Sequence, residues 1–229
     1  MKKSAKRSGV KAKRTTVFIV DDHAIVRRGL EQLINQETDL VVCGEAENMQ
    51  TALEAMKTLR PDVALVDLSL GGESGLELIK DIKVRYPTVA VLVLSMHDEL
   101  FYAERALRAG AKGYIMKLQA ADQILGAIRQ ILSGEIYLSG PMAAKVLRKV
   151  AGGKSEISRS PIERLSDREL EVFQLIGIGV GTRHIAERLS RSVKTVETYR
   201  EHIKQKLDLK DATELTQAAI QWLQSEHTK

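Results

Sequence analysis

Polar side chains that could carry phosphoryl chemistry follow four short hydrophobic runs in the first half of the chain. The runs end in Asp21-Asp22, Asp67, Ser95 and Lys117. Short apolar runs that alternate with amphipathic helical stretches are typical of parallel strands buried on both faces. In such sheets the ligand crevice lies beyond the carboxyl ends of the strands. We therefore expect three carboxylates, a hydroxyl and an ammonium group to lie together at one edge of a sheet.

The chemistry of this set follows from its charges. Three neighbouring carboxylates repel one another unless they share a cation, and Mg²⁺ is a hard ion that prefers such oxygen ligands. Asp67 ends the most apolar run, so it is the carboxylate best placed to attack a phosphoryl group. Lys117 and Ser95 would stabilise the charge on the transferred group. One aspartate alone is equally well explained as a turn residue, whereas the ordered set of four favours a pocket.

The elements that must position these groups are read from hydrophobic periodicity. Strands are predicted at 17–21, 40–43, 63–67, 89–94 and 113–116, and helices at 24–35, 48–59, 75–85, 99–109 and 121–132. Five alternating strands and helices predict an α/β fold, with a doubly wound five-stranded parallel sheet of the flavodoxin-like type. Residues 16–134 form this domain.

The remainder of the chain is predicted to be helical. Residues 135–161 are rich in glycine and proline around one helical stretch at 142–150, which is typical of a linker that contains a short helix. Residues 162–229 predict a small all-α domain. It opens with a capping box at Ser166 and Glu169, and two helices at 183–189 and 193–207 have the dimensions of a helix-turn-helix.

Composition and charge limit the class of protein. The net charge is +5, but residues 1–16 hold seven Lys or Arg and no acid, so 1–15 is predicted to be a basic disordered tail. Residues 161–229 carry equal numbers of acidic and basic side chains. No apolar run approaches the roughly 20 residues of a membrane span, and we expect a cytoplasmic protein without a membrane partner. The five histidines lack metal-ligand spacing.

Four motifs in residues 16–134 are Asp21-Asp22, Val66-Asp67-Leu68-Ser69, Leu94-Ser95 and Lys112 to Lys117. With them the segment resembles the receiver domain of a bacterial two-component response regulator. The resemblance implies that a histidine kinase phosphorylates Asp67. It also implies that Asp22, Asp67 and the Ser69 backbone carbonyl hold Mg²⁺, with Asp21 acting largely through water. Ser95 and Tyr114 would form the switch, the Ser95 hydroxyl moving to the phosphoryl oxygen and Tyr114 rotating inward behind it.

One departure from the receiver pattern lies after the phosphoacceptor strand. Where the family often has Pro-Gly, this chain has Leu70-Gly71-Gly72-Glu73-Ser74-Gly75, which predicts a more pliable loop. Two alternatives share the architecture. Phosphatases of the haloacid dehalogenase type carry Asp-x-Asp, but Ser69 stands two positions beyond Asp67. A flavodoxin-like nucleotide binder would open its first helix with Gly-x-Gly-x-x-Gly, which is missing here.

The C-terminal motifs have their own resemblance. Leu165 to Val172, the Gly179 turn, Ile185 to Leu189 and Ser192 to Arg200 together are similar to the LuxR-type DNA-binding domain of NarL/FixJ-class regulators. The resemblance implies base or phosphate contacts from one set of residues and phosphate contacts from another. The first set is Lys194, Thr198 and Arg200, and the second is Thr182, Ser192, Thr195 and Lys204. Glu197 could accept from a cytosine amine or act as a repulsive filter. Arg191 departs from the family, which usually has an apolar residue there.

These patterns together predict a transcription regulator rather than an enzyme. Phosphorylation of Asp67 by a sensor histidine kinase would alter receiver pairing and the binding of promoter DNA. The alternative is a receiver-fold regulator that acts by binding alone. Residues 213–223 present an apolar stripe (Leu215, Ala218, Ala219, Trp222) that would serve either a partner subunit of a homodimer or packing within its own domain.

Overall fold

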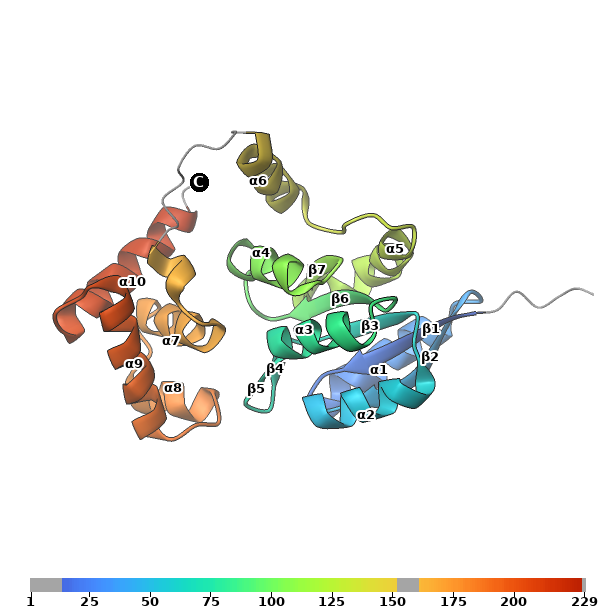
Figure 1. The fold of residues 1–229 in the computed structure, drawn as a ribbon, viewed down its shortest axis with the longest axis horizontal. Coiled ribbons are helices and arrows are strands. Elements are labelled where there is room, and N and C mark those ends of the chain that lie inside the picture. Colours follow the sequence, from blue (N-terminus) through green and yellow to red (C-terminus); the bar gives the residue numbers. More distant parts are fainter. Residues whose placement is uncertain (1–13, 152–160, 228–229) are drawn as a thin grey trace, which may run out of the picture.

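The computed structural model describes residues 14–151 and 161–227. It has a five-stranded parallel sheet with helices on both faces, followed by a group of short helices (Figure 1). Nearly all of the expected basic tail, and residues 152–160 of the expected linker, lie outside the described residues. We call residues 14–132 the sheet domain and 161–227 the helical domain. None of the helices in the described ranges is long and apolar enough to span a membrane.

The strands of the sheet lie in the order β2-β1-β3-β6-β7, and every neighbouring pair is parallel. Their bounds are β1 (Thr15–Val20), β2 (Leu40–Ala46), β3 (Val63–Val66), β6 (Ala90–Ser95) and β7 (Gly113–Met116). This order is that of flavodoxin-like sheets, so the predicted fold class is confirmed. The central strands β1, β3 and β6 end side by side, because Val20, Val66 and Val93 are in register.

Helices cover the two faces of the sheet unequally. Their bounds are α1 (Ala24–Asn35), α2 (Met49–Leu59), α3 (Gly75–Arg85), α4 (Glu99–Ala109) and α5 (Ala120–Leu132), the last preceded by the short 3₁₀ helix η1 (Lys117–Gln119). Successive side chains of a strand point to opposite faces. Accordingly, Val17 and Ile19 join the buried cluster of α1 and α5, whereas Phe18 and Val20 join that of α2, α3 and α4. Each strand is therefore fixed from both sides.

A two-stranded hairpin that the sequence did not predict follows β3. It consists of β4 (Ser69–Leu70) and β5 (Glu73–Ser74), which pair antiparallel. The turn between them is Gly71-Gly72, with φ angles of +55° and +97°. Positive φ at both turn residues is the requirement of a tight hairpin turn and favours glycine. The glycine pair therefore forms the two-residue turn of this hairpin.

The segment after α5 adds to the edge of the sheet before the chain leaves it. The backbone N–H of Tyr137 donates to the Lys112 carbonyl at 2.9 Å, and the Tyr137 carbonyl accepts from the Tyr114 N–H at 3.0 Å. Helix α6 (Gly140–Ala151) follows, and it contains the helical stretch expected at 142–150.

The helical domain contains η2 (Pro161–Arg164), α7 (Asp167–Gly177), α8 (Thr182–Arg188), α9 (Val193–Leu207) and α10 (Ala212–His227). The predicted capping box is confirmed, since the Ser166 N–H donates to Glu169 Oε2 at 2.7 Å and Ser166 Oγ accepts from the Glu169 N–H at 3.4 Å. Together these two bonds satisfy backbone groups that the first turn of α7 leaves unpaired.

Candidate functional site

Three of the expected groups meet at the carboxyl edge of the sheet. Asp21 follows β1, Asp67 follows β3 and Lys117 follows β7. The Lys117 Nζ lies 2.7 Å from Asp67 Oδ2 and 2.7 Å from Asp21 Oδ2. Asp21 and Asp67 are only 1% and 3% exposed, so one ammonium serves two buried carboxylates. That leaves a net negative charge in a pocket that water scarcely reaches.

The pKa values follow from this imbalance. Burial raises the pKa of Asp67 from 3.8 to about 6, although Lys117 pulls it down, and the neighbouring Asp21 adds to the rise. Burial lowers the pKa of Lys117, but Asp67 and Asp21 outweigh that effect and the net pKa is raised. Lys117 therefore stays protonated. The charged form of Asp67, by contrast, is destabilised unless further positive charge binds beside it.

A divalent cation fits the donor set at this edge. Oxygen atoms of Asp21, Asp22 and Asp67 and a ring nitrogen of His23 all lie within 4.8 Å of one another. Asp22 Oδ1 is buried without a hydrogen bond of good geometry, and its near neighbour is the Nδ1 of His23 at 2.6 Å. Hard oxygen donors of this kind suit Mg²⁺. Histidine spacing in the sequence gave no sign of His23, which joins the cluster only because it adjoins Asp22.

Ser69 and Ser95 both lie beside His97 in the loop after β6. The Ser95 hydroxyl is buried and accepts from the His97 N–H at 3.1 Å. The Ser69 hydroxyl lies 3.0 Å from the His97 Nε2. The Ser69 backbone N–H also helps to stabilise the charged form of Asp67. The predicted role of the Ser69 carbonyl as a metal ligand stays a prediction.

Tyr114 is already inside the protein in this structure. Its side chain is 1% exposed, and its hydroxyl donates to the His97 carbonyl at 2.8 Å. Burial raises its pKa well above the usual value, so the phenol stays protonated and a donor. The Ser95 and Tyr114 hydroxyls therefore both bond to the backbone of His97, one to its N–H and the other to its carbonyl. Sequence reasoning placed both residues at the switch but missed His97, the residue that they share.

The helix-turn-helix has the expected division of faces. On α9, Val196 and Ile203 are fully buried, whereas Lys194, Glu197 and Thr198 are exposed. Ser192 caps the helix by accepting from the Thr195 N–H at 3.0 Å. The remaining candidates for DNA contact are partly exposed, namely Thr182 at the start of α8, Thr195, Arg200 and Lys204. The polar side of α9 is therefore accessible to a ligand.

The apolar stripe of α10 packs within the chain. Leu215 and Ala219 are fully buried in the shared core, and the Trp222 ring lies 5.6 Å from that of Phe173 in α7. Trp222 also contacts the sheet domain, because its ring lies 4.6 Å from Phe101 of α4. The sequence left open whether this stripe contacts a partner subunit or packs within its own domain, and the structure supports packing within the chain.

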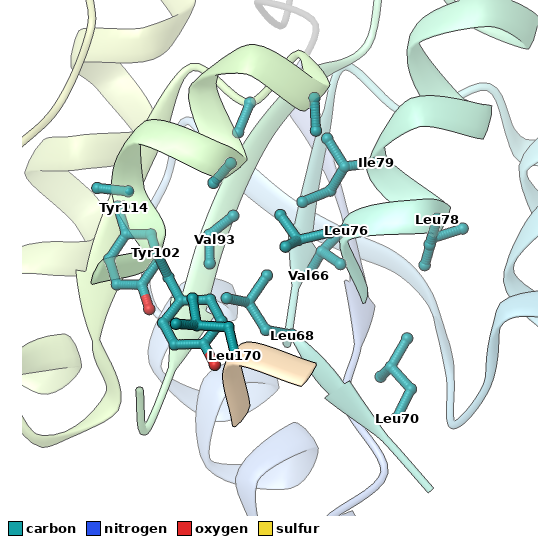
Figure 2. Close-up of a cluster of buried hydrophobic side chains, with 14 of the residues drawn as sticks. Val66, Leu68, Leu70, Leu76, Leu78, Ile79, Val93, Tyr102, Tyr114 and Leu170 are labelled. Carbon is teal, nitrogen blue, oxygen red and sulfur yellow. The ribbon is translucent and has the colours of Figure 1, made fainter. Parts of the chain in front are cut away.

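The sheet and helical domains share an interface that the sequence did not reveal. Arg105 of α4 donates to the carbonyls of Leu165 and Ile162 at 2.8 and 3.2 Å and pairs with Asp167 at 3.0 Å. His97 lies 3.6 Å from Glu171 of α7. Figure 2 shows Leu170 of α7 among the buried side chains of the sheet domain, near Leu68 and Tyr102. Apolar burial and ion pairing both join the domains.

Comparison with known proteins identifies the two parts of this architecture. Residues 17–129 match the model of the response regulator receiver domain, and residues 163–219 match that of bacterial regulatory proteins of the luxR family. The oxygen regulatory protein NreC of Staphylococcus carnosus is 38% identical over 208 residues, which cover 89% of this chain and 96% of the relative. NreC of Staphylococcus aureus strain JH9 is equally similar.

Solved structures agree with this assignment. A two-component response regulator of the LuxR family from Aurantimonas sp. is 29% identical, with a TM-score of 0.56, over 61% of this chain and 99% of that one. RcsB from Salmonella enterica serovar Typhimurium, bound to a promoter with the phosphomimetic BeF₃⁻, is 27% identical, with a TM-score of 0.59, over 90% of this chain and 98% of that one. These neighbours define the class as a receiver coupled to a DNA-binding domain.

The chain belongs to the NarL/FixJ class of two-component response regulators. It is accordingly a DNA-binding transcriptional regulator that is switched by phosphorylation.

Proposed function

We propose that Asp67 is the phosphoacceptor of this regulator and that a sensor histidine kinase is the donor. What supports this assignment is the position of Asp67: it is a buried carboxylate 2.7 Å from the Lys117 ammonium, at the edge where β1, β3 and β7 end. A carboxylate oxygen of Asp67 attacks phosphorus, and the bond between phosphorus and the kinase imidazole breaks. Lys117 then neutralises charge on the new acyl phosphate, and Ser95 donates a hydroxyl to one of its oxygens.

The metal of this reaction is proposed to be Mg²⁺, held by Asp22, Asp67 and the Ser69 carbonyl, with Asp21 acting through water. When bound, the ion supplies the positive charge that the pocket lacks. The chain's own residues position it, because Lys117 fixes Asp67 and Asp21 while the Arg27 guanidinium donates to the Asp21 carbonyl at 2.8 Å.

We further propose that α9 enters the major groove of promoter DNA. Lys194, Thr198 and Arg200 would contact bases or phosphates, and Thr182, Ser192, Thr195 and Lys204 would contact phosphates. Glu197 is exposed on the same side, where it would accept from a cytosine or reject unfavourable sequences. A homodimer on paired half-sites, acting in the cytoplasm, fits a regulator of this class.

The phosphorylation proposal is tested with acetyl phosphate and Mg²⁺. The chain should gain one phosphoryl group by intact-protein mass spectrometry, and hydroxylamine should remove it because an acyl phosphate is cleaved by that nucleophile. Asp67→Asn should gain none. The matched control is Asp81→Asn, which changes a partly exposed aspartate of α3 that pairs with Arg85 and should leave the adduct intact.

Two other results would point to other functions. A pocket that binds Mg²⁺ but never gains the adduct would favour the alternative, a regulator that acts by binding alone. Steady release of phosphate from a phosphomonoester, lost in Asp67→Asn, would favour a phosphatase.

A further inference from the structure

Two of the places where this chain departs from the family pattern, the Gly71-Gly72 turn and Arg191, lie against each other. The guanidinium of Arg191, just before α9, donates to the carbonyl of Gly72 in the β4–β5 turn. The guanidinium of Arg168 in α7 donates to the carbonyl of Glu73, the next residue. Both acceptors are backbone atoms, so these contacts depend on the shape of the hairpin.

The hairpin shape in turn depends on its glycines. A Cβ built on Gly72 would lie 3.4 Å from Cζ of Arg191, and its φ of +97° disfavours other residues. The two carbonyls are presented to the helical domain because the chain reverses within Gly71 and Gly72.

The same hairpin is held from its other side by the acidic cluster. Asp22 Oδ2 accepts a hydrogen bond from the Gly71 N–H at 2.9 Å. Residues 71, 72 and 73 therefore form a continuous link: Asp22 holds the first, and Arg191 and Arg168 hold the other two. The base of the hairpin is Ser69, whose hydroxyl contacts His97.

We propose that the β4–β5 hairpin couples occupancy of the acidic pocket by a divalent cation to the docking of the helix-turn-helix. This inference rests on the proposed metal site. An ion that binds the free Oδ1 of Asp22 pulls on the carboxylate whose other oxygen, Oδ2, accepts from the Gly71 N–H. It also acts on the base of the same hairpin through Ser69. Movement of the turn then weakens the contacts to Arg191 and Arg168, so the cation alone loosens the helical domain before any phosphoryl transfer.

The position of Arg191 links this coupling to DNA binding. It immediately precedes Ser192, the N-cap of the helix proposed to enter the groove. Cationic side chains and backbone N–H groups at a helix N-terminus are natural partners of phosphates. While the Arg191 guanidinium is bound to the Gly72 carbonyl, it is not available to a DNA phosphate. The hairpin then also lies beside the N-terminus of α9. Docking and DNA contact therefore compete for one side chain.

The chain carries its own reporter for the test. Trp222 is its single tryptophan, and it packs on Phe101 across the domain interface. MgCl₂ is titrated into the full chain at constant ionic strength, without phosphodonor or DNA. Calorimetry follows binding of the ion, and Trp222 emission follows docking. We expect the emission to shift to longer wavelength in parallel with binding, since Trp222 loses Phe101 and gains water.

Three variants locate the effect. Arg191→Ala should show the shifted emission without Mg²⁺, because it lacks the guanidinium that donates to the Gly72 carbonyl. Asp22→Asn keeps an oxygen for the Gly71 N–H but loses the charge that attracts the ion, and should lose the Mg²⁺ response. Arg164→Ala removes an exposed arginine of the same domain and should behave as the parent chain.

Each contrary result is distinct. Binding of Mg²⁺ with no change in Trp222 emission would overturn the coupling and leave the proposed metal site standing. So would an Arg191→Ala variant whose emission matches Arg164→Ala. Failure of Mg²⁺ to bind at all would remove both the metal site and the coupling, and an Asp67 adduct formed without the ion would still distinguish that outcome from failure of the phosphorylation proposal.

Discussion

At the scale of single residues, the pocket is defined by an excess of negative charge. Lys117 contacts two buried carboxylates at equal distance, and neither alone receives a full counter-charge. The cost of this arrangement appears in the pKa of Asp67, which burial raises to about 6. A buried acid that is poorly compensated in the fold gains from any cation or modification that balances it.

That imbalance predicts a pH dependence of stability in the absence of divalent cations. The folded pKa of Asp67 is raised, from 3.8 to about 6, so the folded chain holds a proton that the unfolded chain releases in this window. Stability from this residue is therefore full below about pH 4 and is lost as the pH rises through 6, a difference of about 3 kcal/mol. Urea unfolding of the parent chain and Asp67→Asn from pH 4 to 7.5 in EDTA measures it.

The two chains should diverge in that range, with the variant the more stable at neutral pH. Added Mg²⁺ should narrow the gap at pH 7.5, because the ion restores the missing positive charge. Parallel pH profiles in EDTA would contradict the assignment of the raised pKa to Asp67.

At the scale of elements, α9 shows how one helix serves two purposes. Val196 and Ile203 fix it in the core of the helical domain, and the cap at Ser192 sets where it begins. The polar side of the helix does not pack in that core, and Lys194 and Thr198 are exposed near its start. A helix anchored in this way presents its N-terminal turns to a groove with little freedom to adjust.

We predict that Lys194→Ala weakens binding to a duplex selected by the protein from random-sequence DNA. The loss should be about 1–3 kcal/mol for a base contact, or a fall of about one in the slope of log affinity against log salt for a phosphate contact. Fluorescence anisotropy over a salt series measures both. The control is Lys210→Ala, which removes an exposed lysine between α9 and α10. Equal affinities of Lys194→Ala and the parent chain would remove Lys194 from the contact surface.

At the scale of the whole molecule, the receiver and the DNA-binding domain are docked through α4, α7 and the β4–β5 hairpin (Figure 1). The interface reaches the pocket at two points, the hairpin after Asp67 and His97 after Ser95. A change at the phosphoacceptor edge can therefore reach the helical domain through the hairpin or through His97. Neither path requires the five-stranded sheet to change.

Arg105 is the residue at which we expect docking to be most sensitive. It is largely covered and reaches three groups of the helical domain from α4. Arg105→Ala should release the domains, shift Trp222 emission to longer wavelength and leave far-UV circular dichroism unchanged. Arg108→Ala changes an exposed arginine of the same helix that pairs with Glu104, and its emission should match the parent chain. An unshifted Arg105→Ala spectrum would show that its contacts do not hold the domains together.

The sequence alone determined most of the elements and the grouping of the main pocket residues, although not the β4–β5 hairpin. Strand ends, the Ser166 capping box and the apolar side of α9 all follow from local periodicity, and parallel strands bring their carboxyl ends to one edge whatever else the chain does. For that reason Asp21, Asp67 and Lys117 could be grouped before any coordinates.

Only the tertiary structure decided which distant residues meet across the domains. Arg191 and Gly72 are 119 positions apart, and Arg105 and Leu165 are 60 apart. Their pairing depends on how the two domains are placed relative to each other. Periodicity and capping signals describe local structure and carry no information about that placement. The Gly71-Gly72 turn and Arg191 were each visible in the sequence as departures from the family pattern. Their contact could not be predicted, because it forms only when the helical domain docks on the sheet domain.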